Sequence, residues 1–254
     1  IKMCTATQFL DQIIESRMTS VKTLEKGIGL IRFLSEVLPH ITPFLQPMHT
    51  WVAGLHQSKM QRPSGRPGAL HRATAMFVKK ELNEVAMGRN AGHAMVYPEE
   101  AAGTGGSDAK ATEEFAVIGG WWSDTTPPVK SRSHWFSIRV TKSRFPWAYW
   151  KGAPQRAISA LELLGTLFLL YLAGRRAGGT GLHLTVRGIT DSQCNTFAML
   201  RTYSRRLPAA LVHMELMAAA RLYGITVRIR HRKREYNIWA DALTNEETEV
   251  WSPG

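Results

Sequence analysis

The sequence predicts an α/β fold, in which a mixed β-sheet flanked by helices follows a small all-α region. In the first third of the chain, apolar residues recur at threes and fours, which is typical of amphipathic helices. After Gly106, short runs rich in β-branched and aromatic residues alternate with longer apolar runs. Their order is strands, helix, strand, helices, strand and helix, which indicates a sheet covered by helices. We therefore expect two domains, residues 1–97 and 98–254.

The N-terminal domain is predicted to be helical. The run "TSVKTLEKGIGLIRFLSEVL" predicts one helix, with Thr19 or Ser20 as its N-cap and Pro39 at its end. A further helix is expected over residues 69–87. Two compositional breaks are expected, a segment rich in Gly, Pro and basic residues at 56–68 and a segment of small residues, expected to be flexible, at 98–107.

The C-terminal domain begins with two paired strands, 115–123 and 134–141, joined by the turn-forming segment "DTTPPVKSRS". A buried helix follows from residue 158, and its apolar stretch, 163–173, is too short to span a bilayer. The remaining elements are predicted to be a strand (182–190), a helix (192–203), a helix with Pro208 in its first turn, a strand (225–232) and a closing helix (237–247). The tryptophans between these elements are expected to build the core and the sheet face; they are Trp121, Trp122, Trp135, Trp147 and Trp150.

The chain is strongly basic. It has 32 Lys and Arg against 20 Asp and Glu, a formal net charge of +12. Such an excess favours a polyanionic partner, with nucleic acid ahead of a membrane, although many basic proteins have no such partner. Two cysteines form neither a disulfide framework nor a metal-binding set, so we expect a reducing, intracellular compartment, either cytoplasm or nucleus.

Four carboxylates fall at similar places in the predicted elements. Asp108 precedes the strand 115–123, Glu162 lies in the first turn of the buried helix, Asp191 ends the strand 182–190, and Asp241 lies in the closing helix. Strand C-termini and helix N-termini gather on one side of such a sheet. The four acids are therefore predicted to converge.

Convergence of four acids requires a counter-charge. Two carboxylates about 4 Å apart repel by roughly 4 kcal/mol at an effective dielectric constant near 20. Oxygen ligands favour Mg²⁺ or Mn²⁺ over zinc. Two such ions, about 3.5–4 Å apart, activate a water and stabilise the departing oxygen in phosphodiester cleavage. The pattern predicts a metal-dependent nuclease.

Each acid also has a structural interpretation. Asp191 can be a helix N-cap, and Glu162 can be an early-helix acid favoured by the helix dipole. Asp108 can be a turn residue, and Asp241 can pair with an arginine. The common placement of the four acids favours the functional interpretation.

Four motifs in order, "SDAKATEEFAVIGGWW", "AISALELLG", "ITDSQCN" and "EYNIWADALTN", resemble the ribonuclease H domain of retroelement reverse transcriptases, above all that of DIRS-like elements. The resemblance covers about residues 105–246. It implies a five-stranded mixed sheet and hydrolysis of the RNA strand of RNA·DNA hybrids. It also implies two Mg²⁺ ions bound by Asp108, Glu162, Asp191 and Asp241, with His231 beside the site to assist proton transfer or product release.

The upstream segment "LEKGIGLIRFLSEVLPHITPFLQPMHTWV" resembles the helical thumb and connection of the same enzymes. No Y-x-D-D polymerase motif occurs in the chain, so the palm is expected to lie elsewhere in a longer parent chain. The resemblance thus implies the C-terminal part of a retrotransposon polyprotein.

Three alternatives remain open. Asp124 rivals Asp108 as the first metal ligand, because the stretch "AAGTGGSDA" is poor in apolar residues for a strand. A degenerate first strand would leave a remnant that binds nucleic acid without cleaving it. A DNA-acting nuclease of the same superfamily is the third alternative.

Basic and polar residues near the predicted acids are candidates for nucleic-acid contacts. Gln193 and Asn195 are candidates for reading the sugar hydroxyls of RNA. The phosphate-contacting candidates form two groups, Arg201, Arg205 and Arg206 in the first, and Arg228, Arg230, Arg232, Lys233 and Arg234 in the second.

Overall fold

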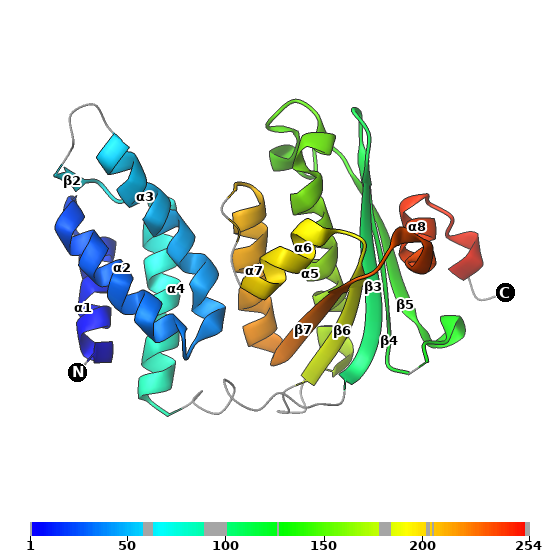
Figure 1. Cartoon of the computed structure of the whole chain (residues 1–254), viewed down its shortest axis with the longest axis horizontal. Helices are drawn as coiled ribbons and strands as arrows, with labels where there is room; N and C mark the ends of the chain where they lie inside the picture. The colour runs from blue at the N-terminus through cyan, green and yellow to red at the C-terminus, as the bar shows by residue number, and fades with distance from the viewer. Residues whose placement is uncertain are drawn as a thin grey trace. The chain divides into compact units, whose positions relative to one another are not determined.

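The computed structural model describes residues 2–57, 63–88, 101–125, 127–177, 184–201, 204 and 206–251. The chain forms two compact units, Ile1–Val96 and Tyr97–Gly254, whose elements are labelled in Figure 1. Each unit has its own buried residues.

The N-terminal unit consists mainly of helices, α1 (Lys2–Glu15), α2 (Val21–Ser35), the 3-10 helix η1 (Pro39–Leu45), α3 (Gln46–Gln57) and α4 (Ala69–Ala86). Ser20 is the N-cap of α2, and its hydroxyl accepts a hydrogen bond from the Thr23 amide at 3.1 Å. The helices predicted over 19–38 and 69–87 are therefore confirmed. The sequence interpretation did not include α1 and α3.

One short strand pair interrupts the all-α character of this unit. Strand β1 (Thr19–Ser20) pairs antiparallel with β2 (Ser64–Gly65). Part of the break predicted at 56–68 is therefore paired, and residues 58–62 of it lie outside the described part of the chain.

The C-terminal unit contains a five-stranded sheet in the order β5-β4-β3-β6-β7. The strands are β3 (Ala101–Ala111), β4 (Ala116–Ser123), β5 (His134–Val140), β6 (Leu184–Thr190) and β7 (Ile225–His231). The pairs β3–β4 and β4–β5 are antiparallel, whereas β3–β6 and β6–β7 are parallel. The prediction of a ribonuclease H-like mixed five-stranded sheet flanked by helices is confirmed.

The flexible break predicted at 98–107 is wrong for residues 101–107, because they form most of β3, the central strand. Residues 98–100 lie outside the described part of the chain. A Cβ atom on Gly105 would lie 2.5 Å from a Leu169 methyl, and one on Gly106 would lie 2.9 Å from the Trp121 indole nitrogen. Large neighbouring side chains thus cover a strand that has few of its own.

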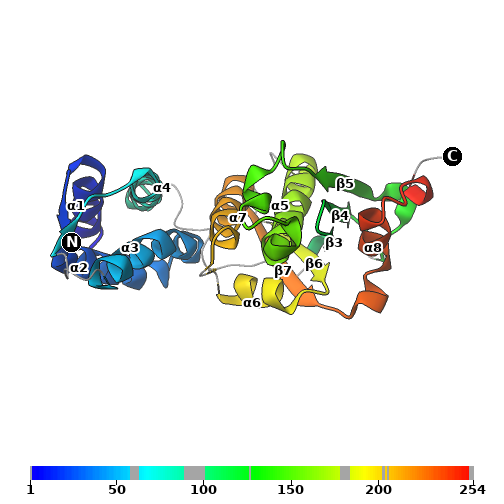
Figure 2. The same cartoon turned by 90° about the horizontal axis from the view of Figure 1, so that it is seen from above.

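Helices cover both faces of the sheet. Helices α5 (Ile158–Ala177) and α7 (Ala209–Tyr223) lie on one face, and α8 (Ile238–Thr244) lies on the other, as Figures 1 and 2 show. Helix α6 (Gln193–Arg201) follows β6. The described part of this unit also contains the 3-10 turns η2 (Lys130–Arg132), η3 (Pro146–Tyr149), η4 (Pro154–Ala157), η5 (Arg234–Tyr236) and η6 (Glu249–Trp251).

Helix α5 forms the centre of the larger core. Pro154–Arg175 is long and apolar enough to cross a membrane by length and composition, yet two thirds of its most apolar window is buried in the fold. Its Leu161, Leu163 and Leu169 are buried beneath the sheet, as expected for a core helix.

A second cluster on the α8 face contains Trp121, Ala240, Leu243 and Trp251. Trp150 is 70% exposed, so its expected place in the core is wrong; it lies just after the short turn η3, where most of its surface faces solvent.

Candidate active site

Asp108 and Asp191 lie on adjacent parallel strands. Gly106 of β3 pairs with Ile189 of β6; Asp108 lies two residues after Gly106 on β3, and Asp191 lies two residues after Ile189, just beyond the end of β6. Asp108 is only 7% exposed, whereas Asp191, directly after β6, is partly exposed. The carboxyl end of β6 thus places a second acid beside the central strand.

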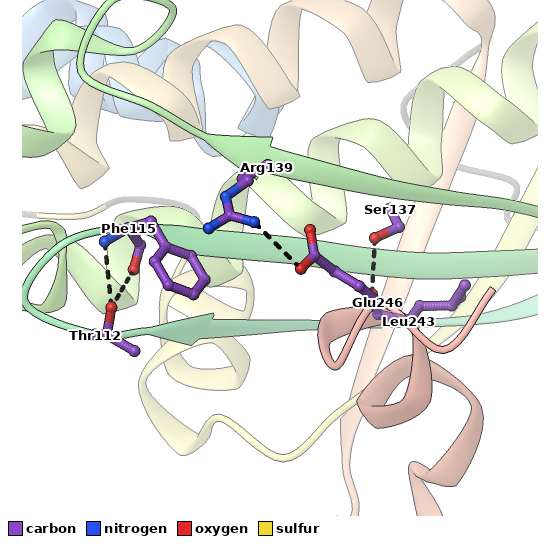
Figure 3. Close-up of polar contacts among 6 residues, drawn as sticks. All are labelled: Thr112, Phe115, Ser137, Arg139, Leu243 and Glu246. Atoms are coloured by element: carbon purple, nitrogen blue, oxygen red, sulfur yellow. Dashed lines mark hydrogen bonds and ion pairs between the residues drawn. The ribbon is translucent and has the colours of Figure 1, made fainter.

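The close packing of α8 on the sheet brings Asp241 towards Asp108 and Asp191. Gly119, which pairs with Asp108, has no room for a side chain, because a Cβ atom there would lie 2.7 Å from Leu243 Cβ and 2.8 Å from the Thr244 amide nitrogen. Hydrogen bonds further along the sheet hold the end of this helix in place (Figure 3): Ser137 Oγ donates to the Leu243 carbonyl at 2.8 Å.

A second contact beyond the end of α8 fixes the same region. The Arg139 guanidinium bonds Glu246 at 3.4 Å and lies 4.1 Å from the centre of the Phe115 ring (Figure 3). Phe115 in turn is held in the β3–β4 turn, where its amide donates to the Thr112 hydroxyl at 3.2 Å. The C-terminal end of α8 is therefore attached to both β4 and β5.

Glu162 approaches from α5. Because α5 begins at Ile158, Glu162 lies beyond the first turn, and the predicted first-turn position is wrong by about one residue. Its carboxylate accepts a hydrogen bond from the Ser192 side chain, which follows Asp191 directly. Stabilisation of Glu162 by the helix dipole is correspondingly weaker than the sequence suggested.

The electrostatics show that the four acids share one region. Burial, together with the charges of Asp191 and Asp241, raises the pKa of Asp108 from 3.8 to about 6, against hydrogen bonds from the Ala109 amide and Thr244 that lower it. Burial also raises the pKa of Glu162 from 4.5 to about 7, assisted by Asp191 and Asp108. Each acid therefore interacts with at least one other acid of the set.

The alternative interpretations of the acids can be compared with these positions. Asp124 is exposed and follows the far end of β4, five residues from Gly119, or about 16 Å along the strand. It lies away from the other acids. Ser192, and not Asp191, stands immediately before α6, so the N-cap interpretation of Asp191 is not supported. Asp241 accepts a hydrogen bond from Asn245 at 3.3 Å.

The donor set suits a hard divalent cation, because all four side chains are carboxylates and two of them have raised pKa values. In the part of the chain that the structure describes, however, no three His, Cys, Asp or Glu side chains are already arranged to hold one ion. The fit is therefore in the chemistry of the ligands, which are all carboxylates.

Several predicted nucleic-acid contacts lie exposed on β7, the edge strand that pairs with β6, or just beyond its end. Arg228 and Arg230 are exposed on β7, and Arg232 and Lys233 are exposed beyond its end. His231 is also exposed; it pairs with Thr190, the residue before Asp191. Gln193 is exposed at the start of α6.

Some predicted contacts cannot be placed. The side chains of Asn195, Arg201 and Arg234, and all of Arg205, lie outside the described part of the structure. Arg206 is exposed.

Sequence reasoning missed three polar residues that contact the acids, Ser192, Thr244 and Asn245. The Thr244 hydroxyl lies 3.2 Å from Asp108 Oδ2 and 2.9 Å from the Asp241 carbonyl oxygen. Their only signal in the sequence is adjacency to acids, since Ser192 follows Asp191 and Thr244 lies three residues after Asp241.

No family model matches the sequence, and no curated protein matches it. The fold is similar to that of the ribonuclease H1 of the halophilic archaeon Halobacterium salinarum NRC-1, with 16% identity over 58% of this chain and 98% of that chain and a TM-score of 0.41. It is also similar to LC11-RNase H1, isolated from compost, with 18% identity over 59% of this chain and 98% of that chain and a TM-score of 0.43.

A third similarity extends over both units. A foamy viral protease-reverse transcriptase, solved in complex with an RNA/DNA hybrid, is 10% identical over 96% of this chain, with a TM-score of 0.40. This chain spans 50% of that protein. The structure itself shows a mixed five-stranded sheet with helices on both faces and four acids whose charges influence one another.

Proposed function

We propose that this chain is a Mg²⁺-dependent endonuclease that hydrolyses the RNA strand of RNA·DNA hybrids. We further propose that it is the C-terminal part of a retroelement reverse transcriptase, similar to those of DIRS-like elements, with its polymerase palm in a longer intracellular parent chain. The motifs described in the sequence support this context.

The observation that carries the proposal is the mutual influence of four acids from distant parts of the sequence. Asp108 is buried in the central strand, and its pKa responds to Asp191 and Asp241, which lie 83 and 133 residues further along the chain. A fold without a cationic ligand gains nothing from this repulsion. A site for divalent cations explains it.

Each acid has a separate part in the proposed site. Asp108 and Asp191, on adjacent strands, would hold cations at the sheet, and Glu162 and Asp241 would bind them from the two flanking helices. When bound, two Mg²⁺ ions would supply an activated water and stabilise the departing oxygen. Mn²⁺ has the same preference for oxygen ligands and is an expected substitute.

The basic residues on β7 would position the substrate. Arg228, Arg230, Arg232 and Lys233 offer exposed cations for the phosphate backbone beside an acidic centre that would otherwise repel it. His231, exposed next to the Asp191 strand, would act in proton transfer or product release. Gln193 and Asn195 remain candidates for contacts with the RNA 2′-hydroxyl.

A matched pair of substitutions tests the proposal. Asp191→Asn keeps the size of the side chain and removes one charge from the cluster, and Asp124→Asn makes the same change at an exposed acid outside it. On a labelled RNA·DNA hybrid with Mg²⁺, we expect the first variant to lose at least 100-fold in cleavage rate, a magnitude within the range for removing a catalytic electrostatic group. The second should cleave as fast as the parent.

Two further measurements distinguish the alternatives. Calorimetric titration of the nucleic-acid-free chain with Mg²⁺ should show binding that Asp191→Asn weakens. Salt-sensitive binding of the hybrid without Mg²⁺-dependent cleavage would identify a catalytically decayed remnant, and faster cleavage of duplex DNA than of hybrid would identify a DNA-acting nuclease. Loss of cleavage in Asp124→Asn alone would overturn the assignment of Asp108.

A further inference from the structure

The residues that follow Asp241 contact two different acids of the cluster. Thr244 is 2% exposed, and its hydroxyl lies 3.2 Å from Asp108 Oδ2 and 2.9 Å from the Asp241 carbonyl oxygen. A hydroxyl has one proton to donate, and an ionised carboxylate is the stronger of these two acceptors. Thr244 therefore connects the central strand to the helix that holds Asp241.

The neighbouring Asn245 contacts the Asp241 side chain. Its Nδ2 donates to Asp241 Oδ2 at 3.3 Å, and its Oδ1 accepts from Lys110 Nζ at 2.6 Å. Both partners require the same amide orientation, because an ammonium can only donate and an ionised carboxylate can only accept. Lys110 lies on β3 two residues after Asp108, so this chain of contacts also joins α8 to the central strand.

We propose that Thr244 and Asn245 are positioning residues, which set the separation and orientation of the Asp108 and Asp241 carboxylates for cation binding. The inference rests on the proposed nuclease function. Neither residue contacts the substrate in this proposal; each acts through the carboxylate that it hydrogen-bonds. Hydrogen-bonding partners of metal ligands commonly change metal affinity or activity by about 10- to 100-fold when removed.

The contact between Thr244 and Asp108 depends on the close approach of the α8 backbone to Gly119. The missing side chain at Gly119 allows the Thr244 amide nitrogen to approach the strand, where a Cβ atom would lie only 2.8 Å from it. Gly119 is the register partner of Asp108, so the approach occurs beside that carboxylate. The second link is exposed to solvent and is therefore the weaker of the two.

Two substitutions at Thr244 separate its hydroxyl from its methyl group. Thr244→Val keeps the shape and removes the hydroxyl, and Thr244→Ser keeps the hydroxyl and removes the methyl. We expect Thr244→Val to weaken Mg²⁺ binding to the nucleic-acid-free chain, measured by calorimetry, by about 10- to 100-fold. It should lower kcat on the hybrid to a similar extent with KM for the hybrid unchanged, and Thr244→Ser should retain both properties of the parent.

The outcomes are distinct. Parental Mg²⁺ affinity in Thr244→Val, or equal losses in Thr244→Ser and Thr244→Val, would overturn the role of the hydroxyl while leaving the nuclease proposal intact. A parent chain that neither binds Mg²⁺ nor cleaves the hybrid would overturn both proposals.

An exposed substitution provides a test that does not depend on the buried one. Asn245→Ala should fold like the parent, as thermal unfolding in EDTA will show, and should weaken Mg²⁺ binding by about 2- to 10-fold, the loss expected for one solvent-exposed hydrogen bond. Glu247→Ala, at an exposed position nearby, is the matched control and should bind like the parent. Unchanged affinity in Asn245→Ala would overturn its part of the proposal.

Discussion

Replacing the buried acid Asp108 by asparagine is expected to stabilise the metal-free protein at alkaline pH. Asp108 is 7% exposed, and burial, with the charges of Asp191 and Asp241, raises its pKa from 3.8 to about 6. A difference of about 2 in pKa, at about 1.4 kcal/mol for each pH unit, corresponds to about 3 kcal/mol. The ionised carboxylate therefore lowers the stability of the folded state by about that amount.

The sign of the effect defines its pH range. The folded-state pKa of this acid is higher than its unfolded value, so the folded state binds the proton more tightly. The penalty is absent below pH 3.8, grows between pH 3.8 and about 6, and is complete above that. Asp108→Asn should therefore gain about 3 kcal/mol at pH 8 and nothing at pH 3.5.

The assay is urea unfolding of parent and variant in EDTA across this range of pH, followed by circular dichroism. The N-terminal unit contributes equally to both proteins, so the difference between them reports on Asp108. Mg²⁺ should then stabilise the parent more than the variant, because a ligand that binds only the folded state stabilises it. A gain below 1 kcal/mol at pH 8, or an equal gain at pH 3.5, would refute the reasoning.

Two predictions concern positions outside the acidic cluster. A Cβ atom on Gly27 would lie 2.3 Å from the Phe9 ring, whereas one on Gly29 would meet no described atom within 4 Å. In thermal unfolding, Gly29→Ala should therefore raise the free energy of unfolding by about 0.5–1 kcal/mol, and Gly27→Ala should lower it. His213 is fully buried, both ring nitrogens lack hydrogen-bond partners within the described structure, and burial lowers its pKa to about 4. Because its protonation is disfavoured in the fold, His213→Leu should raise the urea midpoint more at pH 4.5 than at pH 7.5; an equal shift at both would contradict this.

Much of the fold could be predicted from hydrophobic periodicity, because most elements bury their own apolar side chains. Strand β4 and helix α5 are clear in the sequence for this reason. Strand β3 is not, since Gly103, Gly105 and Gly106 have no side chains, and Trp122, Trp121 and Leu169 fill the space above them. Its cover comes from residues that are distant in the sequence, and periodicity cannot detect it.

The acids could be predicted for a different reason. Asp191 follows a recognisable strand and Asp241 lies in a recognisable helix, so the rule that functional groups gather at strand ends was sufficient to bring them together. Thr244 could not be predicted, because its partner Asp108 lies 136 residues away and no local spacing records the hydrogen bond. Asn245 contacts Asp241 at the i, i+4 spacing of a helix, but its second partner, Lys110, is equally remote.

The glycines of β3 and β4 and the burial of Asp108 have a common structural origin. Side chains at Gly106 and Gly119 would displace Trp121 and α8, and α8 could then no longer cover the carboxylate of Asp108. With α8 held away, the carboxylate would be hydrated and its pKa would return toward the ordinary value. The glycines that weaken β3 and β4 as isolated strands are thus the ones that allow the helix to close over the sheet. A site destabilised by its own charges requires such a rigid support, and a tightly bound cation would offset the destabilisation.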